Sequence, residues 1–128
     1  MTHDLSDLRR VLAFDALTCL GFGGALLIGA TLLAGPTGLS ATFLRFAGAS
    51  LLPVAALFGW MSRTRRLGPG WAWLAIIGNL AWIAASLGVV AAVPLTTFGV
   101  AFVLAQAGIV AALAWAESRS LAGRAMPA

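Results

Sequence analysis

Four long apolar runs constrain this chain more than any other feature of its sequence. They cover residues 8–34, 42–62, 71–93 and 97–117 approximately, and short breaks rich in Gly, Pro or Arg separate them. A helix crosses the hydrocarbon core of a bilayer with about 20 residues, and none of the runs alternates as a barrel strand does. We therefore predict an all-α fold, an integral membrane four-helix bundle with a single membrane domain over residues 1–128.

Composition supports the membrane assignment and narrows the function classes. Hydrophobic residues make up 61% of the 128 residues and charged residues only 9%, whereas soluble domains carry about a quarter charged residues. A soluble enzyme and a disordered tail are therefore excluded. The chain has a single Cys, Cys19, and a single His, His3, too few for an internal disulfide or a multi-His metal site. We expect no metal and no cofactor.

The arginine distribution predicts the orientation in the membrane. With four spans, both termini share a side with the loop between the second and third runs. That side carries seven of the eight basic residues, and the other side carries only Arg45; the seven are Arg9, Arg10, Arg63, Arg65, Arg66, Arg119 and Arg124. Positive residues favour the cytoplasmic side, so we predict cytoplasmic N and C termini.

The same charges bear on location and partners. All eight basic residues are Arg in a chain rich in Ala and Gly, a composition typical of GC-rich bacterial genomes. We therefore expect a multi-pass protein of the bacterial inner membrane, in contact with membrane lipids. The net charge of +4 lies at segment ends rather than on one face, so we expect no nucleic-acid partner.

Arg45 lies about one turn inside the second run, on the predicted outer side. Either its side chain extends outward to the interface from a regular helix, or residues 39–45 form a short interfacial segment. The second alternative is slightly favoured. In both cases Arg45 is a candidate contact for anionic lipid headgroups.

Small residues recur at helical spacing in the spans. Gly21, Ala25 and Gly29 lie four residues apart in the first run, and Gly88 belongs to a similar stripe in the third. Such stripes allow close approach of helix backbones. We expect them to pack helices within the bundle; the alternative is contact with another membrane subunit or a second copy of the chain.

Four polar or amphipathic side chains are predicted to lie inside the membrane, namely Asn79, Trp82, Ser86 and Gln106. Asn79 and Gln106 lie at similar predicted depth on antiparallel neighbours, which favours a hydrogen bond between them. The Trp82 indole needs an acceptor, and the Gln106 amide oxygen is available. This polar seam is interpreted as a contact that sets helix register or, alternatively, as the lining of a pocket for a lipid-like or aromatic ligand.

The acidic residues are expected to lie near the cytoplasmic interface. Asp15 and Glu117 fall near the ends of their runs and are expected to pair with Arg63, Arg65, Arg66 and Arg119. No carboxylate is expected at the bilayer midplane, which argues against proton-coupled transport. No nucleophile–base pair or paired catalytic carboxylates are evident, so we expect no catalytic residues and no enzymatic activity.

In size and number of predicted helices, the chain resembles the small multidrug resistance transporters. That family carries a membrane-embedded Glu in the middle of its first helix, where this chain has Cys19–Gly24, so the resemblance does not extend to the residues that drive export. The chain is more similar to a group of small uncharacterised bacterial four-helix integral membrane proteins. The shared features are Asn79-x-x-Trp82-x-x-x-Ser86, Thr97-x-Gly99 and Gln106-Ala107.

The resemblance implies a fold and no activity. We expect a non-enzymatic inner-membrane protein that acts as an accessory or interaction subunit of a membrane complex. The alternatives are an oligomeric small-molecule transporter or channel, and a membrane protein that binds a lipid or cofactor.

Overall fold

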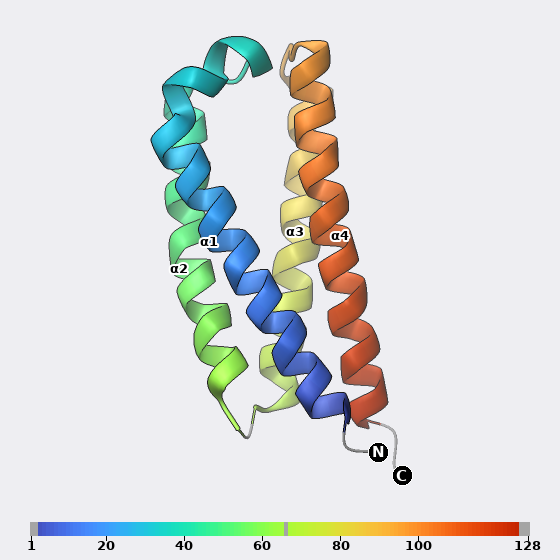
Figure 1. Cartoon of the computed structure of the whole chain (residues 1–128). Coiled ribbons are helices and arrows are strands. Elements are labelled where there is room, and N and C mark those ends of the chain that lie inside the picture. The colour runs from blue at the N-terminus through green and yellow to red at the C-terminus, as the bar shows by residue number, and fades with distance from the viewer. Residues whose placement is uncertain (1–2, 66, 126–128) are drawn as a thin grey trace.

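The computed structural model describes residues 3–65 and 67–125, with side chains described from Leu8 to Ala122 apart from residue 66. The backbone forms four helices, α1 (His3–Thr37), α2 (Ala41–Arg63), α3 (Pro69–Ala92) and α4 (Thr97–Ala125) (Figure 1). Each contains a stretch long and apolar enough to cross a membrane. The fold is therefore an all-helical membrane bundle of four spans, in which α1 and α4 extend beyond the apolar runs.

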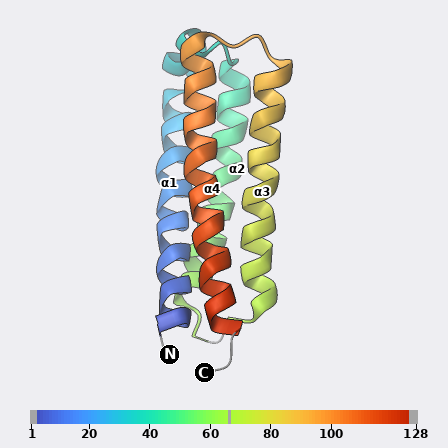
Figure 2. The ribbon, with the colours of Figure 1, turned by 90° about the vertical axis from the view of Figure 1, so that its right-hand side faces the viewer.

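The helices are arranged as two antiparallel hairpins joined through α1 and α4. α1 packs against α2 and α4, and α3 packs against α4, as the two views in Figures 1 and 2 show. In the described part of the chain α2 and α3 do not pack closely against each other. Both ends of the chain and the connection between α2 and α3 lie at one end of the bundle.

Glycines allow a close backbone contact along the length of α1 and α2. A Cβ added to Gly48 would lie 2.6 Å from the Gly23 carbonyl oxygen and 2.8 Å from the Leu27 nitrogen. Because no side chain fits at these distances, the two glycines let the backbones touch. Close packing within the first hairpin therefore depends on Gly23 and Gly48.

The small-residue stripes predicted from the sequence lie elsewhere. Gly21 and Ala25 are exposed on α1, and a Cβ added to Gly21 or Gly88 would meet no atom within 4 Å. At Gly29 the added Cβ would meet only Leu33, on the same helix, at 3.8 Å. The expectation of internal packing is therefore wrong for Gly21, Ala25 and Gly88, which face outward, whereas Gly29 is half-buried.

The two connections at the other end of the bundle are joined to each other. Gly38 has a φ of +83°, which favours glycine, and an added Cβ would lie 3.2 Å from the Pro94 carbonyl oxygen. The Thr96 backbone N–H donates to the Thr37 carbonyl at 3.2 Å, and Gly99 lies directly against that carbonyl. This end of the bundle is therefore closed by backbone contacts between the hairpins.

α2 is regular from its first turn. Ser40 caps it by accepting a hydrogen bond from the Phe43 N–H at 3.0 Å. Arg45 is exposed on this turn and donates from Nη2 to the Thr31 hydroxyl at 3.0 Å. The favoured alternative of a separate interfacial segment over residues 39–45 is thus wrong, because Ser40 starts the helix at Ala41.

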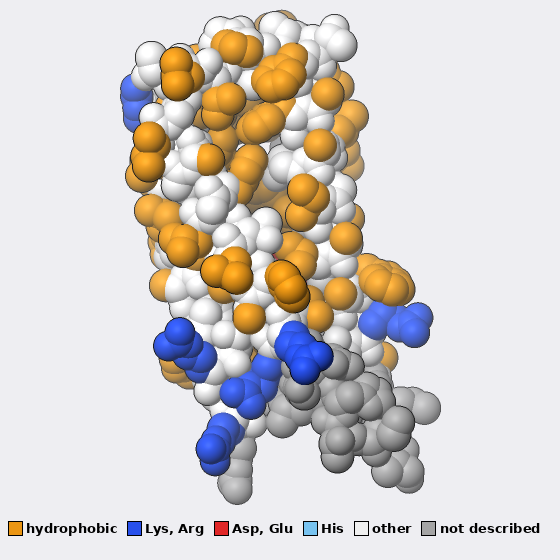
Figure 3. Space-filling view, in the orientation of Figure 1, with side chains coloured by type: hydrophobic (Ala, Val, Ile, Leu, Met, Phe, Trp, Pro, Cys, Tyr) orange, Lys and Arg blue, Asp and Glu red, His pale blue; other side chains and the backbone are white. Residues whose placement is uncertain are grey.

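The outer surface is largely apolar, as Figure 3 shows for one face. Ile28 and Leu32 on α1 are 88% and 81% exposed. Arginine side chains gather toward the end that carries both chain termini. A surface of this kind suits an apolar surrounding between polar ends.

Candidate functional site

Trp82, Ser86 and Gln106 form a closed hydrogen-bond network between α3 and α4. The Trp82 indole Nε1 donates to the Gln106 Oε1 at 2.8 Å, and the Gln106 Nε2 donates to the Ser86 hydroxyl at 2.8 Å. The Ser86 hydroxyl donates to the Trp82 carbonyl, and Gln106 also donates to the Val103 carbonyl. Every donor in this network has a partner, and one lone pair of the Gln106 amide oxygen stays available.

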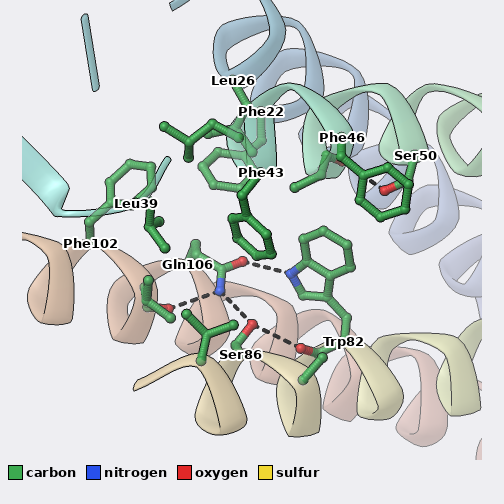
Figure 4. Close-up of a pocket in the computed structure, with 15 residues that line it drawn as sticks. Phe22, Leu26, Leu39, Phe43, Phe46, Ser50, Trp82, Ser86, Phe102 and Gln106 are labelled. Carbon is green, nitrogen blue, oxygen red and sulfur yellow. Dashed lines mark hydrogen bonds between the residues drawn. The ribbon is translucent and has the colours of Figure 1, made fainter. Parts of the chain in front are cut away.

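This network forms one side of a cavity of about 210 Å³. The remaining walls are mainly apolar, and their aromatic side chains come from all four helices. Figure 4 shows Phe22, Phe43 and Phe102 around the space, with Trp82 and Gln106 at its polar side. Phe22 and Phe102 also contact each other, with ring centroids 5.7 Å apart. The cavity is mainly apolar with few polar groups, namely this network and the Ser50 hydroxyl on α2, as small-molecule sites commonly are.

The cavity reaches the outer surface between α2 and α3. Phe46 on α2 is 72% exposed, Ala85 on α3 is exposed as well, and both line the cavity. The opening follows from the architecture, because α2 and α3 do not pack closely in the described part of the chain. In a membrane, such an opening faces the lipid.

Asn79 does not join the network that the sequence predicts for it. Its Nδ2 donates to the Asp15 Oδ2 at 2.7 Å and to the Glu117 Oε1 at 2.9 Å. The expected hydrogen bond between Asn79 and Gln106 is therefore wrong. Asn79 instead links α1, α3 and α4 in a second group of polar side chains, which we call the carboxyl cluster: Asp15, Asn79 and Glu117.

The carboxyl cluster is buried inside the bundle. Asp15 is 1% exposed and Glu117 is 0% exposed, whereas Arg63, Arg65 and Arg119 are exposed. The expected ion pairs with these arginines are thus wrong, and Arg66 lies outside the described residues. The expectation failed because Asn79, near the middle of α3, provides an internal donor for both carboxyl groups.

The hydrogen bonds of the carboxyl cluster are incomplete. Asp15 Oδ1 accepts from the Cys19 thiol at 3.6 Å, a weak donor, and the Asn79 amide joins the Asp15 and Glu117 carboxyl groups. The Glu117 Oε2 atom is buried and has no hydrogen-bond partner among the described residues. A buried carboxyl group needs hydrogen-bond donors or a compensating charge, and among the described residues only Asn79 and Cys19 donate to this pair.

A second cavity, of about 100 Å³, connects the two polar groups. Asp15, Cys19 and Asn79 line it on one side, and Trp82 and Gln106 line it on the other. Trp82 and Gln106 also line the larger cavity. The hydrogen-bonded Trp82–Gln106 pair therefore separates the apolar cavity from the carboxyl cluster.

Sequence reasoning identified Asn79, Trp82, Ser86 and Gln106 but missed Asp15 and Glu117 as members of the site. Their positions in the sequence could have indicated this role, because acidic residues inside a membrane span commonly mark a functional site. Asp15 lies seven residues inside the described span Leu8–Thr37, and Glu117 lies five residues inside Thr97–Ala122. Among the described residues, no group of three or more His, Cys, Asp or Glu side chains is arranged to hold a metal ion.

Comparison of the chain with family models, with curated proteins and with solved structures finds no match.

Proposed function

We propose that this protein is a non-enzymatic membrane protein that binds a small lipophilic molecule carrying one polar, hydrogen-bond-donating group. The observation that carries the proposal is the partly open cavity of about 210 Å³ between the hairpins, which is mainly apolar and has the hydrogen-bonded Trp82–Gln106 pair on one side. The ligand enters sideways from the lipid, between α2 and α3. The bacterial inner membrane is the proposed location, with both termini in the cytoplasm.

The free groups around the cavity favour a donor on the ligand. Gln106 has already committed both of its amide protons and keeps one lone pair on Oε1. An alcohol or phenol hydroxyl can donate to that oxygen without breaking an existing hydrogen bond. The rings of Phe22, Phe43 and Phe102 provide apolar surface for the rest of the molecule.

A substitution that fills the cavity mouth tests this proposal. Ala85→Trp places a large ring in the opening, and Ala84→Trp is the matched control, because Ala84 is equally exposed on α3 but does not line the cavity. The probes are a long-chain alkylphenol and its methyl ether, which lacks the donor, with binding measured on protein in lipid nanodiscs.

We expect the phenol to bind more tightly than its ether by about tenfold. Ala85→Trp should weaken phenol binding by at least as much, and Ala84→Trp should leave it unchanged. Equal binding by all three proteins, or no binding by the parent protein, would overturn the proposal.

A second candidate function, that of an accessory subunit, is favoured by the outward stripe of α1. Gly21 and Ala25 are exposed and can admit a neighbouring helix of a second membrane chain or a second copy. Gly21→Leu should abolish an assembly seen by native mass spectrometry, because the single chain has open space at that position. Gly108→Leu is the control on α4, where an added Cβ also meets nothing within 4 Å.

A further inference from the structure

We propose that the carboxyl cluster is a cation site that binds the protonated amine of the ligand, so that the ligand class is a lipophilic amine. This inference rests on the proposed function, because the apolar part of the ligand occupies the larger cavity. The amine lies in the smaller cavity against Asp15, beyond the Trp82–Gln106 pair.

Charge complementarity carries the first step. Asp15 and Glu117 are buried, and among the described residues the donors that reach them are the Asn79 amide and the Cys19 thiol rather than a guanidinium group. The unpartnered Glu117 Oε2 adds an unused acceptor to the cluster. Buried carboxylates are stable only with a compensating cation or a bound proton, and an ammonium group supplies both charge and several donors.

Space and shape carry the second step. The smaller cavity of about 100 Å³ matches roughly three water molecules in volume, enough for an ammonium group and its first methylenes. Phe22 and Trp82 line both cavities, so aromatic side chains border the smaller cavity as well as the larger one. Aromatic faces attract cations, which favours an amine over a neutral group in the smaller cavity.

Release of a proton on amine binding provides a direct measurement of the proposal. The groups that face the cluster are the Cys19 thiol on α1, Asn79 on α3, and apolar side chains of α2, namely Leu51, Val54 and Phe58. An amine that is already protonated in water brings its own positive charge into the site. In this scheme the carboxyl pair shares one proton while the site is empty, and that proton leaves to the solvent when the amine binds, so that one cation replaces another and the net charge of the site is conserved.

The experiment compares phenethylamine with phenethyl alcohol, which has the same ring and chain but no charge. Binding and proton release are measured together by titration calorimetry of the full chain in nanodiscs, in buffers with different ionisation enthalpies. Asp15→Asn and Glu117→Gln remove the charges with little change of shape. Arg119→Gln is the control, because it changes a charge two residues from Glu117 on the exposed surface.

We expect the amine to bind with release of about one proton per ligand, and the alcohol to bind without proton release. Asp15→Asn and Glu117→Gln should each weaken amine binding by at least about tenfold and leave alcohol binding unchanged. Arg119→Gln should alter neither.

Two outcomes separate this inference from the proposed function. If the alcohol binds and the amine shows neither a preference nor proton release in the parent protein, the cation site is refuted while the cavity stands. If neither probe nor the alkylphenol binds, both proposals fail. Proton release is measured on the unsubstituted protein, so the inference can be tested even if a variant misfolds.

Discussion

The two polar groups inside this bundle are close neighbours and have opposite characters. The Trp82–Ser86–Gln106 network is neutral, and each of its donors has a partner. The carboxyl cluster is acidic, shares a single amide nitrogen between two carboxyl groups, and leaves one buried oxygen without a partner in the described part of the chain. The first group is complete as it stands and serves packing, whereas the second is complete only with a bound cation or proton.

Loss of the shared amide should have the largest effect on stability. Asn79→Leu removes both hydrogen bonds to the carboxyl cluster at similar side-chain volume. Because hydrogen bonds to charged groups contribute about 1.5–3 kcal/mol each, the free energy of unfolding should fall by about 3 kcal/mol or more. Ile77→Leu, at an exposed position of the same helix, is the control. Reversible unfolding in mixed detergent micelles measures the change, and a loss no greater than that of the control would contradict the role assigned to Asn79.

Disrupting the Trp82–Ser86–Gln106 network should lower the free energy of unfolding by less than Asn79→Leu does. Gln106→Leu removes the acceptor of the Trp82 indole and the donor to Ser86, and interhelical hydrogen bonds in membranes contribute about 0.6 kcal/mol each. We therefore expect a loss of about 1 kcal/mol. A double-mutant cycle with Trp82→Phe isolates the pair. A loss equal to that of Asn79→Leu would remove the distinction between the two polar groups.

Neutralising Glu117 in the carboxyl cluster should have the smallest effect on the free energy of unfolding. Glu117→Gln keeps the acceptor for Asn79 and removes the need for a proton or cation, so the free energy of unfolding should change by less than about 0.5 kcal/mol or rise. Glu117→Ala, which instead leaves a cavity and an unmatched Asn79 donor, should lower it by about 2 kcal/mol. Were Glu117→Gln as harmful as Glu117→Ala, the carboxylate itself would be required for folding.

Sequence reasoning reached the four spans and one of the two polar groups. Span length and the turn residues at each break suffice to locate the helices, and the geometry of an antiparallel pair brings Trp82 to Gln106. The carboxyl cluster depends on the contact between α1 and α4, which no local pattern encodes. Asp15 and Glu117 lie near arginines in the sequence, and only the packing of α1, α3 and α4 directs them inward to Asn79.

The glycines show the same limit of prediction from local sequence pattern. Gly23 and Gly48 let α1 and α2 touch, whereas Gly21 and Gly88 face outward, although all four are small residues in apolar helices. Their difference is one of direction around the helix axis, which residue type alone does not specify. Helical spacing therefore identifies a surface that permits close contact but not the neighbour that uses it.

The opening between α2 and α3 determines how binding to this protein must be expressed. A lipophilic ligand that arrives through the lipid is presented at its concentration in the bilayer, which exceeds its aqueous concentration by the partition coefficient. Two amines with identical contacts in the cavity would therefore differ in apparent affinity whenever they partition differently. For the binding that we propose, bilayer composition and thickness would therefore contribute to selectivity, because they set the concentration of ligand in the lipid.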